Sequence, residues 1–269
     1  MKEKAIFWYK QLHFPKEYDE AFYALAEGAD LSAVDVENPI ADLQKKADYG
    51  LNLIYFLACC EDMHKAYCER GIPEEIFNAS AHGLVLEAQL CQQAFGKIGV
   101  YEVAWFNEVI CRQRIMRIGR LQFEMRAAGE EFAGDMVQKD DSVLSVHIPG
   151  HEPLTMEACR EAFQKAKQFF TAYYPEFTYT CFVCDSWMLD ESLDAYLGAT
   201  SNIRNFRKLF TIYKTKEGDD ALKFVLGRTV TRKNIADFKP KTGLQTKLQQ
   251  HVAQGGKLYV CCGRREARP

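Results

Sequence analysis

The hydrophobic periodicity of this chain changes once, near residue 115, and this change most constrains its fold. Before it, apolar side chains recur at spacings of three and four residues, which is typical of amphipathic helices. After it, residues 120–126 alternate apolar and polar side chains, as a strand with one buried face does. The sequence therefore predicts an α+β fold with two domains: a helical domain over residues 1–115, and a domain of mixed strands and helices over residues 116–269.

Helix-boundary signals recur in the first domain. Asn38 precedes Pro39, which is an N-cap residue followed by proline at the first helical position, and helical spacing then continues to Gly71. We expect a long amphipathic helix between these signals, with a break near Gly50. Further helices are predicted over residues 73–95, with an interruption at 81–83, and over residues 101–114.

The second domain carries the boundary signals of short strands and helices. Thr155 can cap a helix that Pro175 stops, and Thr242 with Gln245 has the form of a capping box. Two shorter helices are expected, one ending near residue 198 and one starting at Ser201. Strands are expected over residues 120–126, 142–148, 177–184, 210–214, 223–227 and 257–262. The first two of these strands are predicted to be antiparallel neighbours.

Composition limits the class of protein. Of the 269 residues 48% are hydrophobic, so the chain can bury a sizeable core. The first ten residues hold no apolar run long enough for a signal peptide, and the longest apolar stretch, residues 51–60, is too short to cross a bilayer. We therefore expect a cytoplasmic protein without a membrane partner, in which the ten cysteines are reduced and mostly packed in the interior.

The charge is distributed unevenly along the chain. The net charge is -3, yet the part from Arg204 onward holds 16 Lys or Arg against five Asp or Glu. Such a basic segment can attract an anionic ligand or pair with the acidic remainder of the same chain. Aromatic residues do not alternate with the basic ones, so nucleic acid is not expected as a partner.

Four segments in the second half carry a family resemblance. They are residues 119–124 (GRLQFE), 146–149 (VHIP), 184–189 (CDSWML) and 201–203 (SNI). In this order they resemble a family of largely uncharacterised bacterial proteins that join a helical N-acyltransferase N-terminal domain to a GNAT-like C-terminal domain. The resemblance covers most of the chain. It implies a GNAT-like mixed sheet flanked by helices, with acyl-CoA or acetyl-CoA as co-substrate.

The resemblance also implies where the co-substrate lies. In the GNAT fold the acyl-CoA occupies a gap between two splayed strands, and its pyrophosphate meets the N-terminus of the helix that follows the first strand. By order of elements these are residues 142–148, 155–173 and 177–184, so Ile148, Gly150 and Thr155 become candidate cofactor-binding residues. The usual glycine-rich phosphate loop is replaced by residues 149–154 (PGHEPL), whose two prolines lack backbone donors.

A second candidate anion site is the helix start at residues 201–204. Ser201, Asn202 and Arg204 combine a capping hydroxyl, an amide and a cation, which suits a phosphate. A plain N-cap explains Ser201 equally well.

Acyl transfer to an amine requires a base and a donor for the developing oxyanion. His147 lies near the end of its expected strand and faces away from its apolar neighbours, so it is a candidate base. Asp185 and Ser186 end the second strand, where such a site would open, and Glu124 lies on the polar face of its own strand. Ser186 can alternatively cap the next helix. These four residues are the candidate catalytic residues.

Two cysteine patterns invite a metal or redox interpretation. Cys60, His64 and Cys68 share one helix face, but ligands spread over two turns cannot all reach one ion. Cys181 and Cys184 point to opposite faces of a strand because their separation is odd. No metal cofactor is expected.

Two functions remain open at this point. One is a GNAT-like acyltransferase that moves an acyl group from acyl-CoA to a small-molecule or peptide amine. The other is a catalytically silent GNAT-like protein that binds a ligand or a partner, which the loop at residues 149–154 favours. A hydrolase that uses Ser186 is a more distant alternative, because no Gly-x-Ser-x-Gly motif surrounds this serine. The sequence indicates no oligomeric state.

Overall fold

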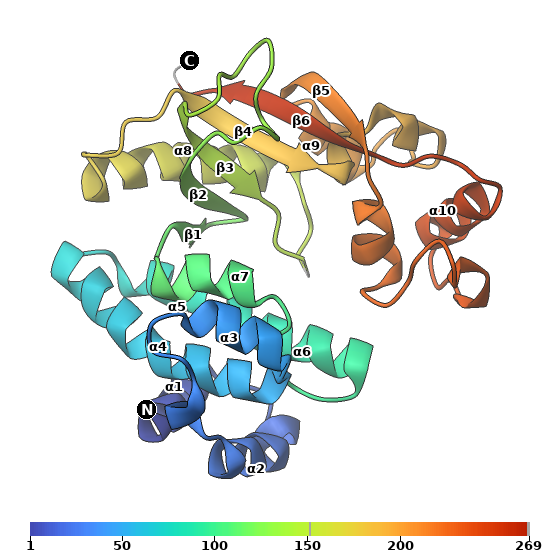
Figure 1. Cartoon of the computed structure of the whole chain (residues 1–269). Helices are drawn as coiled ribbons and strands as arrows, with labels where there is room; N and C mark the ends of the chain where they lie inside the picture. Colours follow the sequence, from blue (N-terminus) through green and yellow to red (C-terminus); the bar gives the residue numbers. More distant parts are fainter. Residues whose placement is uncertain (151, 268–269) are drawn as a thin grey trace. The chain divides into compact units, whose positions relative to one another are not determined.

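The computed structural model describes residues 1–150 and 152–267 (Figure 1). The chain divides into two compact units, Met1–Arg117 and Ile118–Pro269. The first unit is helical and the second contains most of a six-stranded mixed sheet with flanking helices, so the predicted α+β fold is confirmed. No helix in the described ranges is both long and apolar enough to cross a membrane.

The first unit is built around α4 (Tyr49–Arg70), whose buried side chains include Leu53, Phe56 and Met63. The helices α1, α2, α5 and α6 and the turn η3 contact this central helix. Their bounds, with those of the remaining elements, are α1 (Lys2–Gln11), η1 (Lys16–Tyr18), α2 (Asp19–Gly28), η2 (Leu31–Ala33), α3 (Pro39–Lys46), α5 (Glu74–Ala81), α6 (Gly83–Phe95), α7 (Val103–Phe106) and the π-helical turn η3 (Asn107–Cys111).

The long helix expected from Pro39 to Gly71 is two helices, and the break comes slightly before Gly50. Ala47 adopts a left-handed conformation with φ of 50°, which ends α3. Asp48 then caps α4, because its Oδ1 accepts a hydrogen bond of 3.0 Å from the backbone N–H of Leu51. Gly71, with φ of 71°, ends α4 as expected.

The strand order of the sheet is β1-β2-β3-β4-β6-β5. The strands β2 and β3 pair antiparallel, as the sequence predicts, whereas β3 and β4 are parallel. The strand β4 pairs antiparallel with β6, and β6 with β5. The strands are β1 (Ile115–Ile118), β2 (Leu121–Ala127), β3 (Ser142–His147), β4 (Cys181–Ser186), β5 (Thr211–Glu217) and β6 (Tyr259–Glu266).

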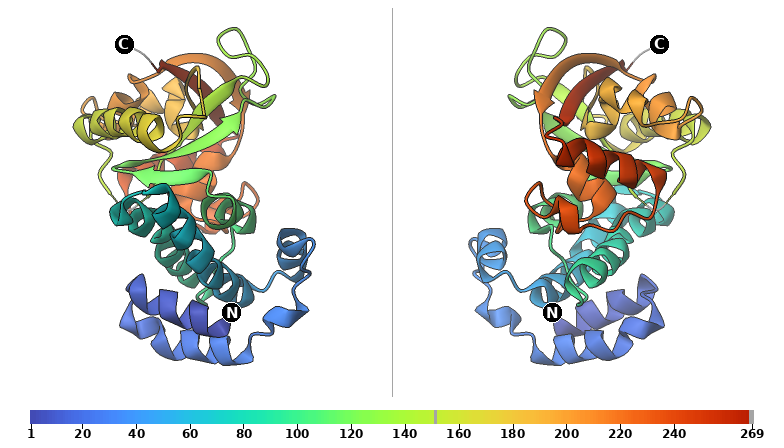
Figure 2. Two further views of the ribbon diagram at one scale, coloured as in Figure 1. Left: turned by 90° about the vertical axis from the view of Figure 1, so that its left-hand side faces the viewer. Right: turned by 90° about the vertical axis from the view of Figure 1, so that its right-hand side faces the viewer.

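One face of the sheet is covered by α8 (Met156–Tyr173), which connects β3 to β4 (Figure 1, Figure 2). Phe163 of this helix lies against Phe123 of β2 and Phe182 of β4, with ring centroids 5.7 and 5.0 Å apart. Thr155 caps the helix as predicted, since its Oγ1 accepts a 3.2 Å hydrogen bond from the N–H of Ala158.

The remaining elements of the second unit are short helices. A separate apolar cluster includes Leu222, Leu226, Leu248 and Val252, and α10 lies beside η6 and η7 there (Figure 2). The bounds are η4 (Trp187–Leu189), η5 (Glu191–Ala195), α9 (Asn202–Arg207), η6 (Leu222–Leu226), η7 (Ile235–Asp237) and α10 (Gly243–Ala253).

The strand expected over residues 223–227 is wrong. This segment is the π-helical turn η6, in which Leu222 and Leu226 are buried while Phe224 is 64% exposed. A short run of apolar and β-branched residues does not distinguish a strand from a helical turn, and here packing against α10 decides. The strand expected from residue 177 begins at Cys181, because Phe177 is held in a turn by a hydrogen bond to the carbonyl of Tyr174.

Candidate functional site

The parallel seam between β3 and β4 is short. In the described chain it consists of the pairs Leu144 with Phe182 and Ser145 with Val183, and the N–H of Thr180 donates to the carbonyl of Ser142 at 2.9 Å. Beyond this seam β3 continues to His147 and β4 to Ser186. The last two residues of β3 and the last three of β4 are therefore not paired with each other.

Both strands keep their outer partners beyond the seam. All six residues of β3 pair with β2, and all six residues of β4 pair with β6. The sheet is thus two ribbons, β1-β2-β3 and β4-β6-β5, joined by the seam. Because each ribbon is complete on its own, sheet twist can separate the strand ends without breaking the outer ladders.

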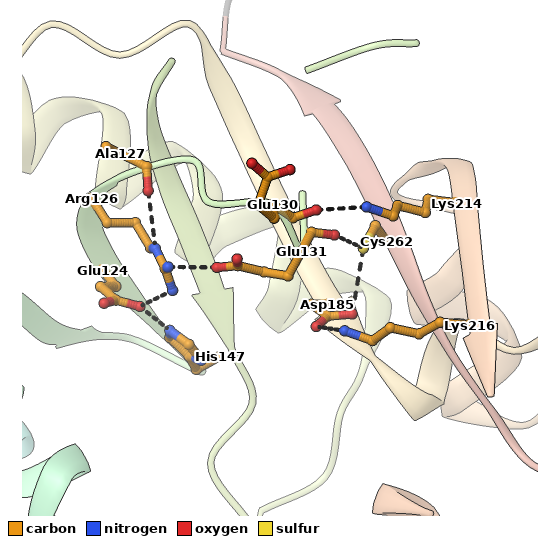
Figure 3. A network of polar contacts seen from close by, with 10 residues as sticks. All are labelled: Glu124, Arg126, Ala127, Glu130, Glu131, His147, Asp185, Lys214, Lys216 and Cys262. Carbon is orange, nitrogen blue, oxygen red and sulfur yellow. Dashed lines mark hydrogen bonds and ion pairs between the residues drawn. The ribbon is translucent and has the colours of Figure 1, made fainter. Parts of the chain in front are cut away.

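His147 and Asp185 occupy equivalent positions on the two ribbons. His147 is two residues beyond Ser145 and Asp185 is two residues beyond Val183, so both side chains lie on the face opposite α8. Figure 3 shows the side chains of this face converging from both ribbons. The sequence predicts both residues separately, but only the register shows that they lie on the same face of the sheet beyond the seam.

Glu124 and His147 form a direct pair across β2 and β3. The Nε2 atom of His147 is 3.0 Å from Oε2 of Glu124 (Figure 3). The side chain of Glu124 is 12% exposed and that of His147 is 28% exposed. Since a carboxylate accepts hydrogen bonds, Nε2 is the donor in this contact, and Nδ1 is the ring nitrogen that can act as a base. A carboxylate–imidazole pair of this kind can serve as a general base.

Arg126 supports the carboxylate of Glu124 from the same strand. Its Nη1 is 3.6 Å from Oε2 of Glu124, and its Nη2 is 2.5 Å from Oε1 of Glu131. The guanidinium also lies over the ring of Phe132, 5.4 Å from the centroid. These contacts restrict Arg126, so Glu124 is held between a histidine and an arginine.

Asp185 is engaged on the other ribbon. Lys216 of β5 donates to its Oδ2 at 2.7 Å, and the thiol of Cys262 on β6 donates to its Oδ1 at 3.4 Å (Figure 3). Partial burial opposes the charge of Lys216, yet the hydrogen bond and the charge of Asp185 prevail and raise the pKa of that lysine. Burial and then the charge of Asp185 raise the pKa of Cys262 to about 12. Asp185 is therefore an ion-paired carboxylate.

Ser186 lies on the opposite face of β4 from Asp185. Its Oγ accepts a 3.2 Å hydrogen bond from the N–H of Met188, so it caps η4. This is the helix-capping role that the sequence analysis left open beside the nucleophilic one.

The loop after β3 is held by Arg120, which is 7% exposed. Its Nε donates to the carbonyl of Pro153 at 3.1 Å and its Nη2 to the carbonyl of Glu152 at 2.8 Å. Ile148 and Gly150 precede this clamp, while residue 151 lies outside the described residues. Arg120 therefore orients the chain that leads to the N-terminus of α8.

The helix start at Ser201 is different from the one at Thr155. Ser201 stands at the N-cap position of α9 but forms no side-chain capping bond, and Asn202 is exposed. Arg204 pairs with Asp194 at 3.2 Å. The cation predicted to bind a phosphate is thus engaged within the second unit.

The arginines around the domain boundary pair within their own units. Arg112 and Arg114 both contact Glu108, at 3.1 and 3.7 Å, whereas Arg120 and Arg126 contact residues of the second unit.

Sequence reasoning missed the residues that support the site. Arg126 and Glu131 brace Glu124, and Lys216 and Cys262 hold Asp185. The polar alternation of Gln122, Glu124 and Arg126 is the only local signal for any of them. The others come from a loop and two distant strands, which a linear pattern does not connect.

A mixed sheet split at a parallel seam, with a capped helix leaving the first of the two seam strands, defines a GNAT-like domain. Residues 115–265 match the family model of the GNAT-like C-terminal domain, and residues 9–111 match that of the N-acyltransferase N-terminal domain. The first match alone covers more than half of the chain. The chain therefore belongs to the family of proteins with a GNAT-like C-terminal domain, and the resemblance read from the sequence is confirmed.

Solved structures share this fold over the whole chain. One is described as an acyltransferase in complex with decanoyl-CoA and teicoplanin, with a TM-score of 0.79 and 21% identity, covering 98% of this chain and 88% of that one. Another, an acyltransferase in complex with decanoyl-CoA, has a TM-score of 0.76 at 21% identity and the same coverage. At this identity the likeness shows the fold. No curated protein matches the sequence.

Proposed function

We propose that this protein is an acyl-CoA-dependent N-acyltransferase that uses the opening beyond the seam between β3 and β4. The observation that carries this proposal is the Glu124–His147 pair, which places an oriented imidazole at the end of β3 where the ladder with β4 has stopped. The family supports this class of reaction. Its N-terminal domain is described as an N-acyltransferase domain, and its C-terminal domain as GNAT-like.

The seam suits an extended, amide-bearing ligand. Beyond Ser145 and Val183 the backbones of β3 and β4 are no longer paired with each other. An extended ligand that carries amide groups can form hydrogen bonds to such strand edges. The pantetheine arm of coenzyme A has this chemistry. Thr155 and the N-terminus of α8 follow β3 directly, and a helix N-terminus favours the pyrophosphate at the other end of the arm. Solved relatives of this fold hold decanoyl-CoA or CoA.

His147 takes the role of base in this proposal. It accepts a proton from the attacking amine at Nδ1 while Glu124 stabilises the imidazolium through Nε2. The amine nitrogen bonds to the thioester carbon, the carbon–sulfur bond breaks, and the thiolate takes a proton to leave as free coenzyme A. Asp185 faces the same opening from the other ribbon and remains the second candidate.

The acceptor is proposed to be an amine on a small molecule or a peptide. Acyltransferases of this fold are described in complex with teicoplanin or with 10C-teicoplanin, which supports an acceptor of this kind. The cytoplasm is the proposed location, because all ten cysteines are free thiols and a reducing compartment maintains them.

A silent binding protein is the competing function. Two prolines in residues 149–154 remove backbone donors that a phosphate would use.

A depression on the exposed side of α8, lined by Met156, Glu157, Arg160, Glu161 and Gln164, carries two carboxylates against one cation and is poorly suited to phosphates. The proposal therefore places the ligand at the seam.

Thermal unfolding with acetyl-, octanoyl- and decanoyl-CoA separates the two functions. A ligand present at 100 times its Kd stabilises the native state by about 2.7 kcal/mol, so binding raises Tm measurably. Release of free thiol from the same acyl-CoA in the presence of simple amines then reports turnover. Stabilisation without thiol release supports the silent protein, and no stabilisation by any acyl-CoA contradicts both the acyltransferase and a coenzyme A-binding role.

A further inference from the structure

Three side chains with metal-binding atoms gather on the helical unit, outside the seam. His64 and Cys68 belong to α4, and Glu74 begins α5. One ligand atom from each lies within 4.8 Å of the others. We propose that His64, Cys68 and Glu74 bind one Zn²⁺ ion.

The three ligand atoms lie close enough together for side-chain rotation to bring them onto one tetrahedral ion. Nε2 of His64 is 3.8 Å from Sγ of Cys68 and 2.9 Å from Oε2 of Glu74. Ligands that each stand about 2.0–2.3 Å from a tetrahedral zinc are roughly 3.3–3.8 Å apart. Sγ of Cys68 is nearly equidistant from Nε2 and Nδ1 of His64, at 3.8 and 3.9 Å, so the thiol lies beside the imidazole and has to rotate towards Nε2 when an ion binds. The carboxylate of Glu74, whose ligand atom lies within 4.8 Å of the other two, has to close on the same ion.

The local fold explains why these three residues meet. His64 and Cys68 are four residues apart, so they lie on the same helix face one turn from each other. Gly71 ends α4 in a left-handed conformation, and α5 then begins at Glu74. The chain therefore reverses within a few residues and presents the carboxylate to the two side chains that preceded the turn.

Aromatic packing holds the imidazole in place. The His64 ring lies 5.1 Å from the ring of Trp8 and 4.8 Å from that of Phe77, measured between centroids. Trp8 is itself held by a hydrogen bond of 3.1 Å from its Nε1 to Glu61. A ligand restrained before the ion arrives loses less entropy on binding.

Cys60 does not belong to this site, although it shares the helical spacing. It is fully buried, and burial raises its pKa well above the ordinary value. The set of Cys60, His64 and Cys68 considered from spacing therefore cannot form, whereas Glu74 supplies the third ligand from the next helix. A linear pattern on one helix cannot reveal that ligand.

Ligand type favours zinc over the common hard cations. A thiolate and an imidazole suit Zn²⁺, while Mg²⁺ and Ca²⁺ prefer oxygen ligands throughout. Both His64 and Glu74 retain solvent exposure, at 33% and 59% of their side chains. Solvent can thus supply a fourth ligand.

Titration of the purified full chain with Zn²⁺ by calorimetry, and with Co²⁺ by absorption, tests the site. We expect one equivalent of metal and a sulfur-to-cobalt charge-transfer band in the near ultraviolet. Cys68→Ser removes the band and weakens Zn²⁺ binding more than about tenfold, and Glu74→Gln weakens it without removing the band. Bound Zn²⁺ also slows alkylation of Cys68.

Cys111→Ser is the matched control, because Cys111 is an exposed cysteine outside the cluster. This variant keeps the band and the affinity. The proposal is overturned if the chain takes up no Zn²⁺, or if Cys68→Ser binds it as tightly as the unchanged chain. None of these readouts depends on acyl transfer, so the result is separate from the proposed function.

Discussion

Oε2 of Glu124 and Nε2 of His147 are 3.0 Å apart across β2 and β3, at the strand end where the ladder with β4 has stopped. The pair exists because residues 122 and 124 of β2 lie on the same face as residues 145 and 147 of β3.

His147→Ala is expected to lower kcat for acyl transfer by roughly 10²–10⁴-fold, the usual range for loss of a general base. Glu124→Gln should give a smaller loss, because the imidazole remains but its orienting carboxylate is gone. Thiol release at saturating acyl-CoA measures both. His13→Asn, at an exposed histidine of the helical unit, should retain full activity. Unchanged turnover in His147→Ala would remove this histidine from the mechanism.

Asp185→Asn is expected to reduce kcat less than His147→Ala does. The carboxylate already pairs with Lys216 and accepts from Cys262, so it is less available to take a proton from an amine. Lys216 is 43% exposed on its side chain, so loss of the ion pair should cost about 1 kcal/mol of stability or less. Turnover and urea unfolding of Asp185→Asn and His147→Ala, measured under the same conditions, test this expectation. A larger loss of kcat in Asp185→Asn would make Asp185 the base.

Thr155→Ala and Ser201→Ala form a matched pair at two helix starts. Thr155 accepts a capping hydrogen bond at the start of α8, and its loss should cost about 1 kcal/mol. Ser201 forms no such bond, so its substitution should change the free energy of unfolding by less than about 0.5 kcal/mol. Urea denaturation at neutral pH gives both values. Equal costs at the two positions would contradict the assigned capping.

Cys262 is expected to make stability fall at alkaline pH. Its pKa is raised from 9.0 to about 12 by burial and by the charge of Asp185, so between these values the unfolded chain releases a proton that the folded chain keeps. The contribution is complete below pH 9.0 and is lost as pH rises towards 12. Urea midpoints between about pH 8 and pH 11 should therefore decrease less in Cys262→Ala than in the unchanged chain. Parallel curves for the two proteins would show that this thiol does not contribute.

Local patterns predict the elements whose signals are complete within a few residues. The alternation of residues 120–126 predicts β2, and Thr155 predicts the start of α8. The segment 223–227 lacks such a signal, because its run of apolar residues fits a strand and a helical turn equally. Packing of Leu222 and Leu226 in the cluster with α10 selects the turn.

The candidate site divides in the same way. Polar alternation along β2 singles out Glu124, and polarity near the strand ends singles out His147 and Asp185. Their partners Glu131, Lys216 and Cys262 come from a loop and from strands far along the chain. No spacing rule connects residues that meet only when β4 pairs with β6 and β6 with β5.

By itself the sequence predicted the α+β class, the strand–helix–strand order around α8, and the family, because each depends on hydrophobic period, capping residues and short ordered motifs. The tertiary structure alone decided that β3 and β4 pair over a short seam, that Glu124 contacts His147, and that Glu74 joins His64 and Cys68. The physical reason is that these contacts depend on strand register and on the reversal of the chain between helices. Both are set by the packing of whole elements, which local propensity does not specify.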